Sequence, residues 1–141
     1  MKPFATILLL AVILSVTQVV QAANSSLELV LCDEHVVFNA STNISMDMIC
    51  RNVGETNLNP AELLTDLTVV LDGKEFKRDL RRTPSLNILL SFEPKRGWRR
   101  SISLSDFHIP PEALASGRHT VALRVLGSES NTQTIFIEPR K

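Results

Sequence analysis

Two cysteines, Cys32 and Cys50, carry the most recognisable chemistry in this chain. They can form a disulfide, or they can remain as two buried thiols that pack as small hydrophobic side chains. If the chain turns at Ser41, the strand-like runs on either side pair with Cys32 opposite Cys50. Opposed residues of an antiparallel pair have Cα atoms about 4.5–5.5 Å apart, a separation that a disulfide tolerates. This register predicts a Cys32–Cys50 disulfide.

A second group of chemically capable residues surrounds the only tryptophan. We call the following residues the basic turn: Lys95, Arg96, Trp98, Arg99 and Arg100. Four cations beside an indole ring suit an acidic glycan, a phosphate-bearing surface or an acidic protein, with the ring stacking on a sugar or an arginine. The alternative is a solvated turn in which Trp98 closes the end of the fold. The turn is thus a candidate anion-binding site.

Patterns typical of catalysis and metal binding are missing from the sequence. It contains no Gly-x-Ser-x-Gly, Walker, His-Glu-x-x-His or Cys-x-x-Cys motif. His35, His108 and His119 lack the spacing of metal ligands, and His119 is expected to be a hydrogen-bonded core histidine. Asp33 and Glu34 are adjacent, so in a strand they would point to opposite faces. The sequence therefore predicts a protein that is not an enzyme and that uses no metal or cofactor.

The N-terminus has the three parts of a secretory signal. A lysine near the start precedes a long apolar stretch, and small residues follow at Ala22. We expect a signal peptide over 1–22, cleaved after Ala22. The alternative is an uncleaved anchor, because 4–20 is near the lower limit of about 17 residues for a membrane span. Polar side chains within and after that stretch favour cleavage, and hence a secreted or periplasmic protein with no further span.

Residues 23–141 form a single predicted domain, large enough for its own core. The chain has 15 basic and 15 acidic residues, so its overall charge indicates no partner, and export argues against nucleic acid. Short alternating runs separated by turn residues are expected as strands at 67–71, 86–92, 98–104, 118–126 and 132–137. They predict an immunoglobulin-like or fibronectin type III-like antiparallel β-sandwich of about seven strands. The chain has no tyrosine and no cysteine in its penultimate strand, which excludes a true immunoglobulin domain.

Three asparagines begin glycosylation sequons: Asn24, Asn39 and Asn43. If the source is eukaryotic, Asn39 and Asn43 lie at the predicted turn near Ser41, where a glycan fits. In a bacterial protein these sequons have no such meaning.

Short motifs resemble those of bacterial secreted cell-adhesion-related (CARDB-like) domains. Residues 51–56, Arg-Asn-Val-Gly-Glu-Thr, look like the Arg-Asn-x-Gly-(Asp/Glu)-Thr end of a strand in those domains. Residues 70–74 resemble their Asp-Gly-Lys hairpin, and 116–121 resemble the entry to their penultimate strand. The resemblance covers roughly 27–138 and implies an immunoglobulin-like β-sandwich. The sequence departs from the family at 94–97, where Pro-Gly is usual, and in having a cysteine pair.

These observations predict a secreted, non-catalytic module that mediates protein–protein binding or assembly. One alternative is a module that binds an acidic glycan or another anion through the basic turn. The other is an enzyme inhibitor on an immunoglobulin-like scaffold, for which the sequence contains no inhibitor-loop motif.

Overall fold

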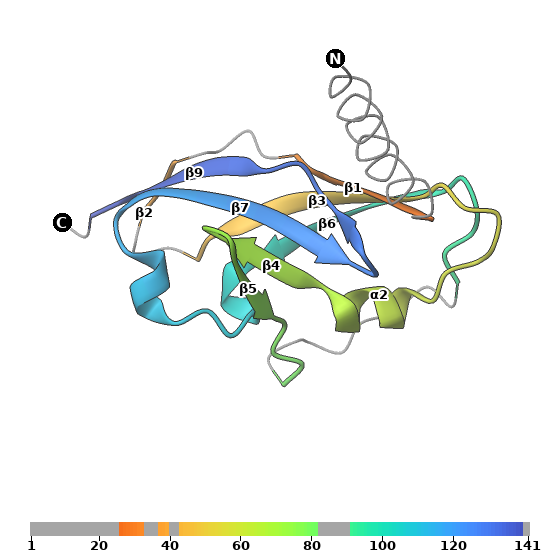
Figure 1. The fold of residues 1–141 in the computed structure, drawn as a ribbon, viewed down its shortest axis with the longest axis horizontal. Coiled ribbons are helices and arrows are strands. Elements are labelled where there is room, and N and C mark those ends of the chain that lie inside the picture. The colour runs from red at the N-terminus through yellow and green to blue at the C-terminus, as the bar shows by residue number, and fades with distance from the viewer. Residues whose placement is uncertain (1–25, 33–36, 40–42, 82–90, 140–141) are drawn as a thin grey trace, which may run out of the picture.

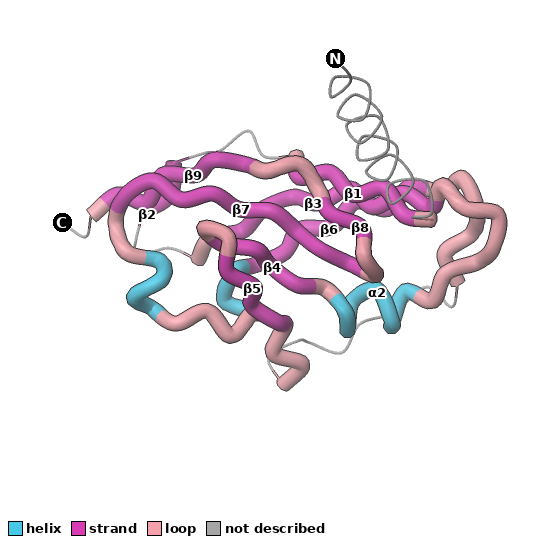
Figure 2. The backbone as a smooth tube through the Cα atoms, viewed as in Figure 1, coloured by secondary structure: helices cyan, strands magenta, loops and turns pink. Residues whose placement is uncertain are grey.

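The protein is a sandwich of two β-sheets. The computed structural model describes residues 26–32, 37–39, 43–81 and 91–139 of the 141-residue chain. Within these residues there are nine strands, one α-helix and two 3₁₀ turns (Figures 1 and 2). The predicted antiparallel β-sandwich is therefore confirmed. The predicted signal peptide over 1–22, Asn24 and the turn at Ser41 lie outside the described residues, as does most of the strand expected at 86–92.

The smaller sheet has three antiparallel strands in the order β1-β3-β6. These strands are β1 (Leu27–Leu31), β3 (Ser45–Asn52) and β6 (Gly97–Ser103). Every second residue of β1 and β3 is buried, as expected for a sheet with one face on the core and one face in water.

The larger sheet has six strands and follows the order β2-β9-β7-β4-β5, with β8 paired to β7. The strands are β2 (Val37–Asn39), β4 (Thr68–Leu71), β5 (Lys74–Lys77), β7 (Gly117–Val125), β8 (Ser128–Glu129) and β9 (Gln133–Glu138). The short β2 runs parallel to β9, and the other pairs are antiparallel. Asp72 and Gly73 link β4 to β5 with positive φ angles of 49° and 78°, as a tight two-residue hairpin requires.

Short helical segments connect the strands at the ends of the sandwich. Helix α2 (Pro60–Asp66) begins after Asn59, because the Asn59 side chain caps it by accepting a hydrogen bond from the Ala61 N–H at 3.0 Å and Pro60 suits the first helical position. The 3₁₀ turns η1 (Leu104–Asp106) and η2 (Pro111–Leu114) lie between β6 and β7. No helix among the described residues is long and apolar enough to cross a membrane.

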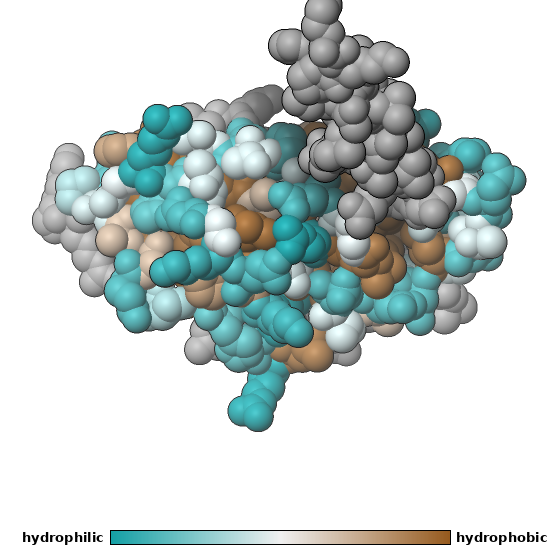
Figure 3. Space-filling view, in the orientation of Figure 1, coloured by the Kyte–Doolittle hydropathy of each residue, from teal (hydrophilic) through white to brown (hydrophobic). Residues whose placement is uncertain are grey.

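The core fills the space between the sheets. It consists of apolar side chains from the inward faces of both, and its fully enclosed members include Met46, Leu67, Leu71, Leu104, Leu123, Ile135 and Ile137. Burying such a side chain contributes about 1.5–3 kcal/mol. The outer face of the larger sheet is mostly hydrophilic (Figure 3). Arg124 forms ion pairs there with Glu75 and Glu129, which fits an ordinary solvated surface.

The cysteine register predicted from the sequence is wrong. Cys50 lies opposite Leu29, and the Cys32 N–H donates to the Asp47 carbonyl at 2.8 Å, so the pairing is displaced by three residues. An odd displacement places the two sulfurs on opposite faces of the sheet, about 10 Å apart along the strands. Both thiols are free, with Cys50 buried in the core and Cys32 half-buried. Burial raises the pKa of the Cys50 thiol to about 12.

The physical reason for this displacement is that the chain does not continue as a hairpin after Cys32. Instead β2 pairs with β9 of the other sheet, where Phe38 packs against the core from one side. Phe38 is therefore paired with Ile137 of β9.

Candidate functional site

One buried amide organises the end of the sandwich at which β3 finishes and β6 begins. Asn52 is completely buried, although it is polar. Its Nδ2 donates to the Thr56 carbonyl at 2.8 Å and to the Phe92 carbonyl at 2.9 Å, and its Oδ1 accepts from the Gly54 N–H at 3.0 Å. A single side chain thus joins the loop after β3 to the segment before β6.

The backbone of Asn52 holds the same two segments together. Its N–H donates to the Arg96 carbonyl at 3.0 Å, and its carbonyl accepts from the Lys95 N–H at 2.8 Å. Lys95 has a φ of 64°, a left-handed conformation that is uncommon outside glycine. Leu58 and Phe92 bridge the loops further out. The basic turn is therefore fixed by its neighbours before any ligand arrives.

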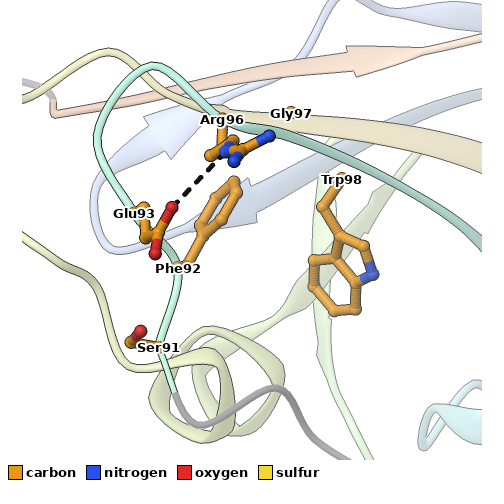
Figure 4. A pocket seen from close by; sticks show the side chains of 6 residues that line it. All are labelled: Ser91, Phe92, Glu93, Arg96, Gly97 and Trp98. Carbon is orange, nitrogen blue, oxygen red and sulfur yellow. Dashed lines mark hydrogen bonds and ion pairs between the residues drawn. The ribbon is translucent and has the colours of Figure 1, made fainter.

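Beside the basic turn lies a pocket of about 340 Å³ (Figure 4). The residues that line it are Ser91, Phe92, Glu93, Arg96, Gly97 and Trp98. The rings of Phe92 and Trp98 meet edge to face, with centroids 6.4 Å apart and planes at 63°. Phe92 is buried and anchors the floor, while Trp98 is half-buried and remains accessible. We call this the aromatic pocket.

The structure brings together all five residues of the basic turn, but it places carboxylates beside three of them. The ion pairs are Lys95–Glu55 at 3.9 Å, Arg96–Glu93 at 3.4 Å and Arg99–Asp47 at 2.6 Å. Arg100 instead lies over the Trp98 ring, 5.6 Å from the ring centroid. The surface at the turn is consequently mixed in charge rather than uniformly positive, and its role in anion recognition stays a prediction.

Asn52 is the residue of this site to which the sequence alone gives no role. A sequence pattern that points to Asn52 does exist, because Asn52 and Gly54 are both defined positions of the Arg-Asn-x-Gly-Glu-Thr motif at residues 51–56. A Cβ atom on Gly54 would lie 2.8 Å from the Cβ of Ser26 and 3.3 Å from the Asn52 Oδ1. The motif therefore records the close packing around a buried amide.

His119 forms a separate polar cluster at the opposite end of the sandwich, as the expected hydrogen-bonded histidine. Its Nδ1 lies 2.7 Å from the Asp72 Oδ2, and its Nε2 lies 2.7 Å from the Ala115 carbonyl oxygen. Both partners are acceptors, so both ring nitrogens can donate when the imidazole is protonated. Burial lowers the pKa of His119, but the bonds to Ala115 and Asp72 outweigh burial and raise the pKa overall.

The described residues contain no cluster of three or more His, Cys, Asp or Glu side chains that could hold a metal ion. The predicted sequon residues Asn39 and Asn43 are both exposed, and the Asn43 Oδ1 accepts from the Ser103 hydroxyl at 2.6 Å.

The chain matches no protein-family model and no curated protein sequence. Among solved structures, it is similar to the CARDB domain of a Pyrococcus furiosus protein, crystallised in complex with di-metal ions. The two share 13% identity with a TM-score of 0.50, over 81% of this chain and 94% of that one. The alkylpurine DNA glycosylase AlkC of Pseudomonas fluorescens, bound to DNA, gives 16% identity and a TM-score of 0.50 over 82% of this chain. A β-glucosidase of Listeria innocua gives 11% identity and a TM-score of 0.50 over the same share.

These similarities concern the fold. The chain spans 31% of the length of the glycosylase and 16% of the length of the glucosidase. At 11–16% identity, the matches confirm an immunoglobulin-like β-sandwich with a CARDB-like resemblance.

Proposed function

We propose that the protein is a secreted, non-catalytic β-sandwich module that binds a protein partner through the aromatic pocket. The observation that carries the proposal is the pairing of Phe92 and Trp98 inside a pocket whose rim holds Arg96 and Glu93. Tryptophan and arginine are enriched among the residues that dominate binding energy at protein interfaces.

The charge around the aromatic pocket favours a protein segment over a polyanion. A glycan bearing many negative charges would gain from a field of one sign, but Glu55, Glu93 and Asp47 lie beside the cations of the basic turn. A protein segment carries both signs and can complement both members of the Arg96–Glu93 pair. The pocket has a volume of about 340 Å³, which is enough room for a large apolar side chain of the partner beside Arg96 and Glu93.

The support beneath the aromatic pocket also suits a binding surface. Asn52 fixes both loops through hydrogen bonds that involve no titrating group. A partner therefore does not have to order these loops when it binds, which lowers the entropic cost of association.

Export is the part of the proposal that rests on the signal over 1–22. N-terminal sequencing of the protein recovered outside the cytoplasm is expected to begin at Ala23. If Met1 is instead retained on a membrane-bound form, the signal would be an uncleaved anchor and the protein would not be released.

Site-specific photo-crosslinking tests the binding proposal. A photoreactive amino acid at Arg96, on the pocket rim, is expected to form an adduct with one protein, whereas the same group at the exposed Glu112 on η2 is not. The identified partner should then bind Trp98→Ala more than about tenfold less tightly than wild type. Circular dichroism would verify that this variant folds.

Two results would contradict the proposal. Equal adducts from both positions would show non-specific contact. Retention on heparin that is lost with salt and with reversal of the four basic-turn cations, but not with Trp98→Ala, would favour the acidic-glycan alternative.

A further inference from the structure

The outer face of the larger sheet carries an exposed apolar pair where β2, β9 and β7 lie side by side (Figure 1). Val37 on β2 and Phe136 on β9 are register partners, and they are 54% and 46% exposed. Their neighbours in the chain, Phe38, Ile135 and Ile137, pack in the core, so the side chains of the exposed pair point outward. An aromatic ring thus lies in water on a face that is otherwise mostly hydrophilic (Figure 3).

Two opposite charges flank this pair on the same face. Arg118 on β7 lies directly across from Phe136, and Glu138 lies two residues further along β9, so all three side chains point outward. Both charged residues are exposed, and among the described residues neither forms an ion pair or a side-chain hydrogen bond. On the other half of this face, Arg124 is instead paired with two carboxylates. We call Val37, Phe136, Arg118 and Glu138 the β9 patch.

The positions of the two charges make the β9 patch complementary to itself. Residues two apart on a strand are separated by about 6.8 Å, and neighbouring strands by about 4.8 Å. Arg118 and Glu138 therefore lie at similar distances from Phe136, in directions roughly at right angles. A two-fold axis over Phe136 that bisects this angle places Arg118 of each copy opposite Glu138 of the other. The strands of the two copies then cross at about 90°, which is one of the two ways in which β-sheets pack face to face.

We propose that the β9 patch is the contact surface of a two-fold symmetric homodimer. The Phe136 rings of the two copies pack at its centre, and an Arg118–Glu138 ion pair lies on each side. The rings supply most of the binding energy, while the ion pairs select this arrangement. A second copy is favoured as the occupant because the two unpaired charges are placed as the two-fold axis requires. The surface is small, so the dimer should be reversible, with a dissociation constant above about 1 µM. It shares no residue with the aromatic pocket or the basic turn.

Sedimentation velocity of the purified protein, from about 1 µM to about 1 mM, tests the dimer. The wild type is expected to change from monomer to dimer in this range. Phe136→Thr, which keeps a strand-forming residue on the exposed face, should raise the dissociation constant at least about tenfold. Val30→Thr is the matched control: Val30 is 36% exposed on the outer face of β1 in the smaller sheet, and this variant should dimerise as the wild type does. Circular dichroism would verify that both variants fold.

An exchange of charges tests whether the ion pairs join two copies. Arg118→Glu and Glu138→Arg should each weaken dimerisation at least about tenfold, because each places like charges opposite one another at both contacts. An equimolar mixture of the two variants should form a heterodimer, since every contact then joins opposite charges. An ion pair within one copy would not produce that recovery.

Three results would overturn the proposal. The first is a wild type that stays monomeric up to the highest concentration, which would leave the β9 patch to a different protein. The second is equal association of Phe136→Thr and Val30→Thr. The third is a mixture of the two charge variants that associates no better than either variant alone.

Discussion

The two ends of the sandwich are each held by one short polar side chain, but one of these is neutral and the other is charged. At the end with the aromatic pocket, Asn52 is fully buried and joins two loops through its amide. At the other end, the Asp72 carboxylate in the β4–β5 turn accepts from the Thr120 N–H at 2.8 Å and pairs with His119. The first arrangement does not titrate, whereas the second depends on pH. The pocket end should therefore keep its geometry over a wider pH range.

The two arrangements also differ in their exposure to water. The Asp72 side chain is 46% exposed, so solvent screens its interactions, while the Asn52 side chain has no contact with solvent. Removal of the amide should thus cost more than removal of the ion pair, although the ion pair has the larger formal charges. The predictions below test this order.

The largest effect is expected from Asn52→Ala. The substitution removes three hydrogen bonds made by a fully buried side chain, at a cost of about 3 kcal/mol in the free energy of unfolding. The Gly54 N–H and the Phe92 carbonyl keep their backbone partners. Urea denaturation followed by circular dichroism measures the loss. Asn59→Ala, which removes the exposed cap of α2, is a matched control that should cost about 1 kcal/mol. Equal losses for the two variants would show that the loops hold each other without the amide.

The packing around Asn52 is tested by two glycine substitutions. Gly54→Ala places a methyl group 2.8 Å from the Ser26 Cβ and should destabilise the protein by about 1–3 kcal/mol. Gly97→Ala meets no atom within 4 Å and should be neutral, or stabilising by about 0.5 kcal/mol. Thermal unfolding compares the two. If both variants have the same Tm, the loop after β3 can shift to accommodate the added methyl group despite its close packing.

The charged end should show a limited pH window. Hydrogen bonds lower the pKa of Asp72 although burial alone would raise it, so its contribution is present above about pH 3.8 and fades as pH falls through the lower folded pKa. The contribution of His119 is present below about pH 6.5 and is lost as pH rises through its higher folded pKa.

His119→Gln should remove the alkaline decline in stability. Since the Asp72 side chain is half-exposed, we expect the decline in wild type to be about 1 kcal/mol or less. Denaturation in urea at a series of pH values from 5 to about 9 would measure it. A decline of the same size in His119→Gln would assign the pH dependence to other groups.

The smallest effect is expected from the exposed ion pairs beside the aromatic pocket. Arg96→Ala should change the free energy of unfolding by less than about 0.5 kcal/mol, because both partners of the Arg96–Glu93 pair are mostly in water. It should still weaken binding of the partner. A large loss of stability would mean that Arg96 stabilises the fold of the basic turn and is not simply a side chain on the rim of the aromatic pocket.

Local patterns in the sequence were sufficient to predict most strands. The alternation at 118–126 predicts β7, and Asp72-Gly73 predicts the β4–β5 hairpin, because parity and turn type depend on neighbouring residues. The register of β1 with β3 depends instead on distant residues. The Asn131 side chain accepts from the Leu31 N–H at 2.8 Å and donates to the Leu31 carbonyl at 3.2 Å. No spacing between the cysteines could reveal that constraint.

The candidate site was predicted only where it depends on residues that are close in the sequence. The clustering of the basic turn with Trp98 follows from adjacency in the sequence. Its pairing with Asp47 and Glu55 does not, because those acids come from the first half of the chain. Arg78 is buried and bridged to Phe107, and no local pattern in the sequence indicates that burial.

The parallel pairing of β2 with β9 has a consequence for the order in which the protein can be assembled. Strand β9 is the last of the described strands in sequence order, yet it provides the neighbour of β2, and Asn131 holds Leu31 across 100 residues of sequence. Strand β2 therefore cannot take its final place until β9 has been synthesised. Such long-range pairing slows folding and leaves early segments exposed to other contacts. A chain that ended before residue 133 would leave β2 without its partner and would expose the edge of β7 that β9 covers.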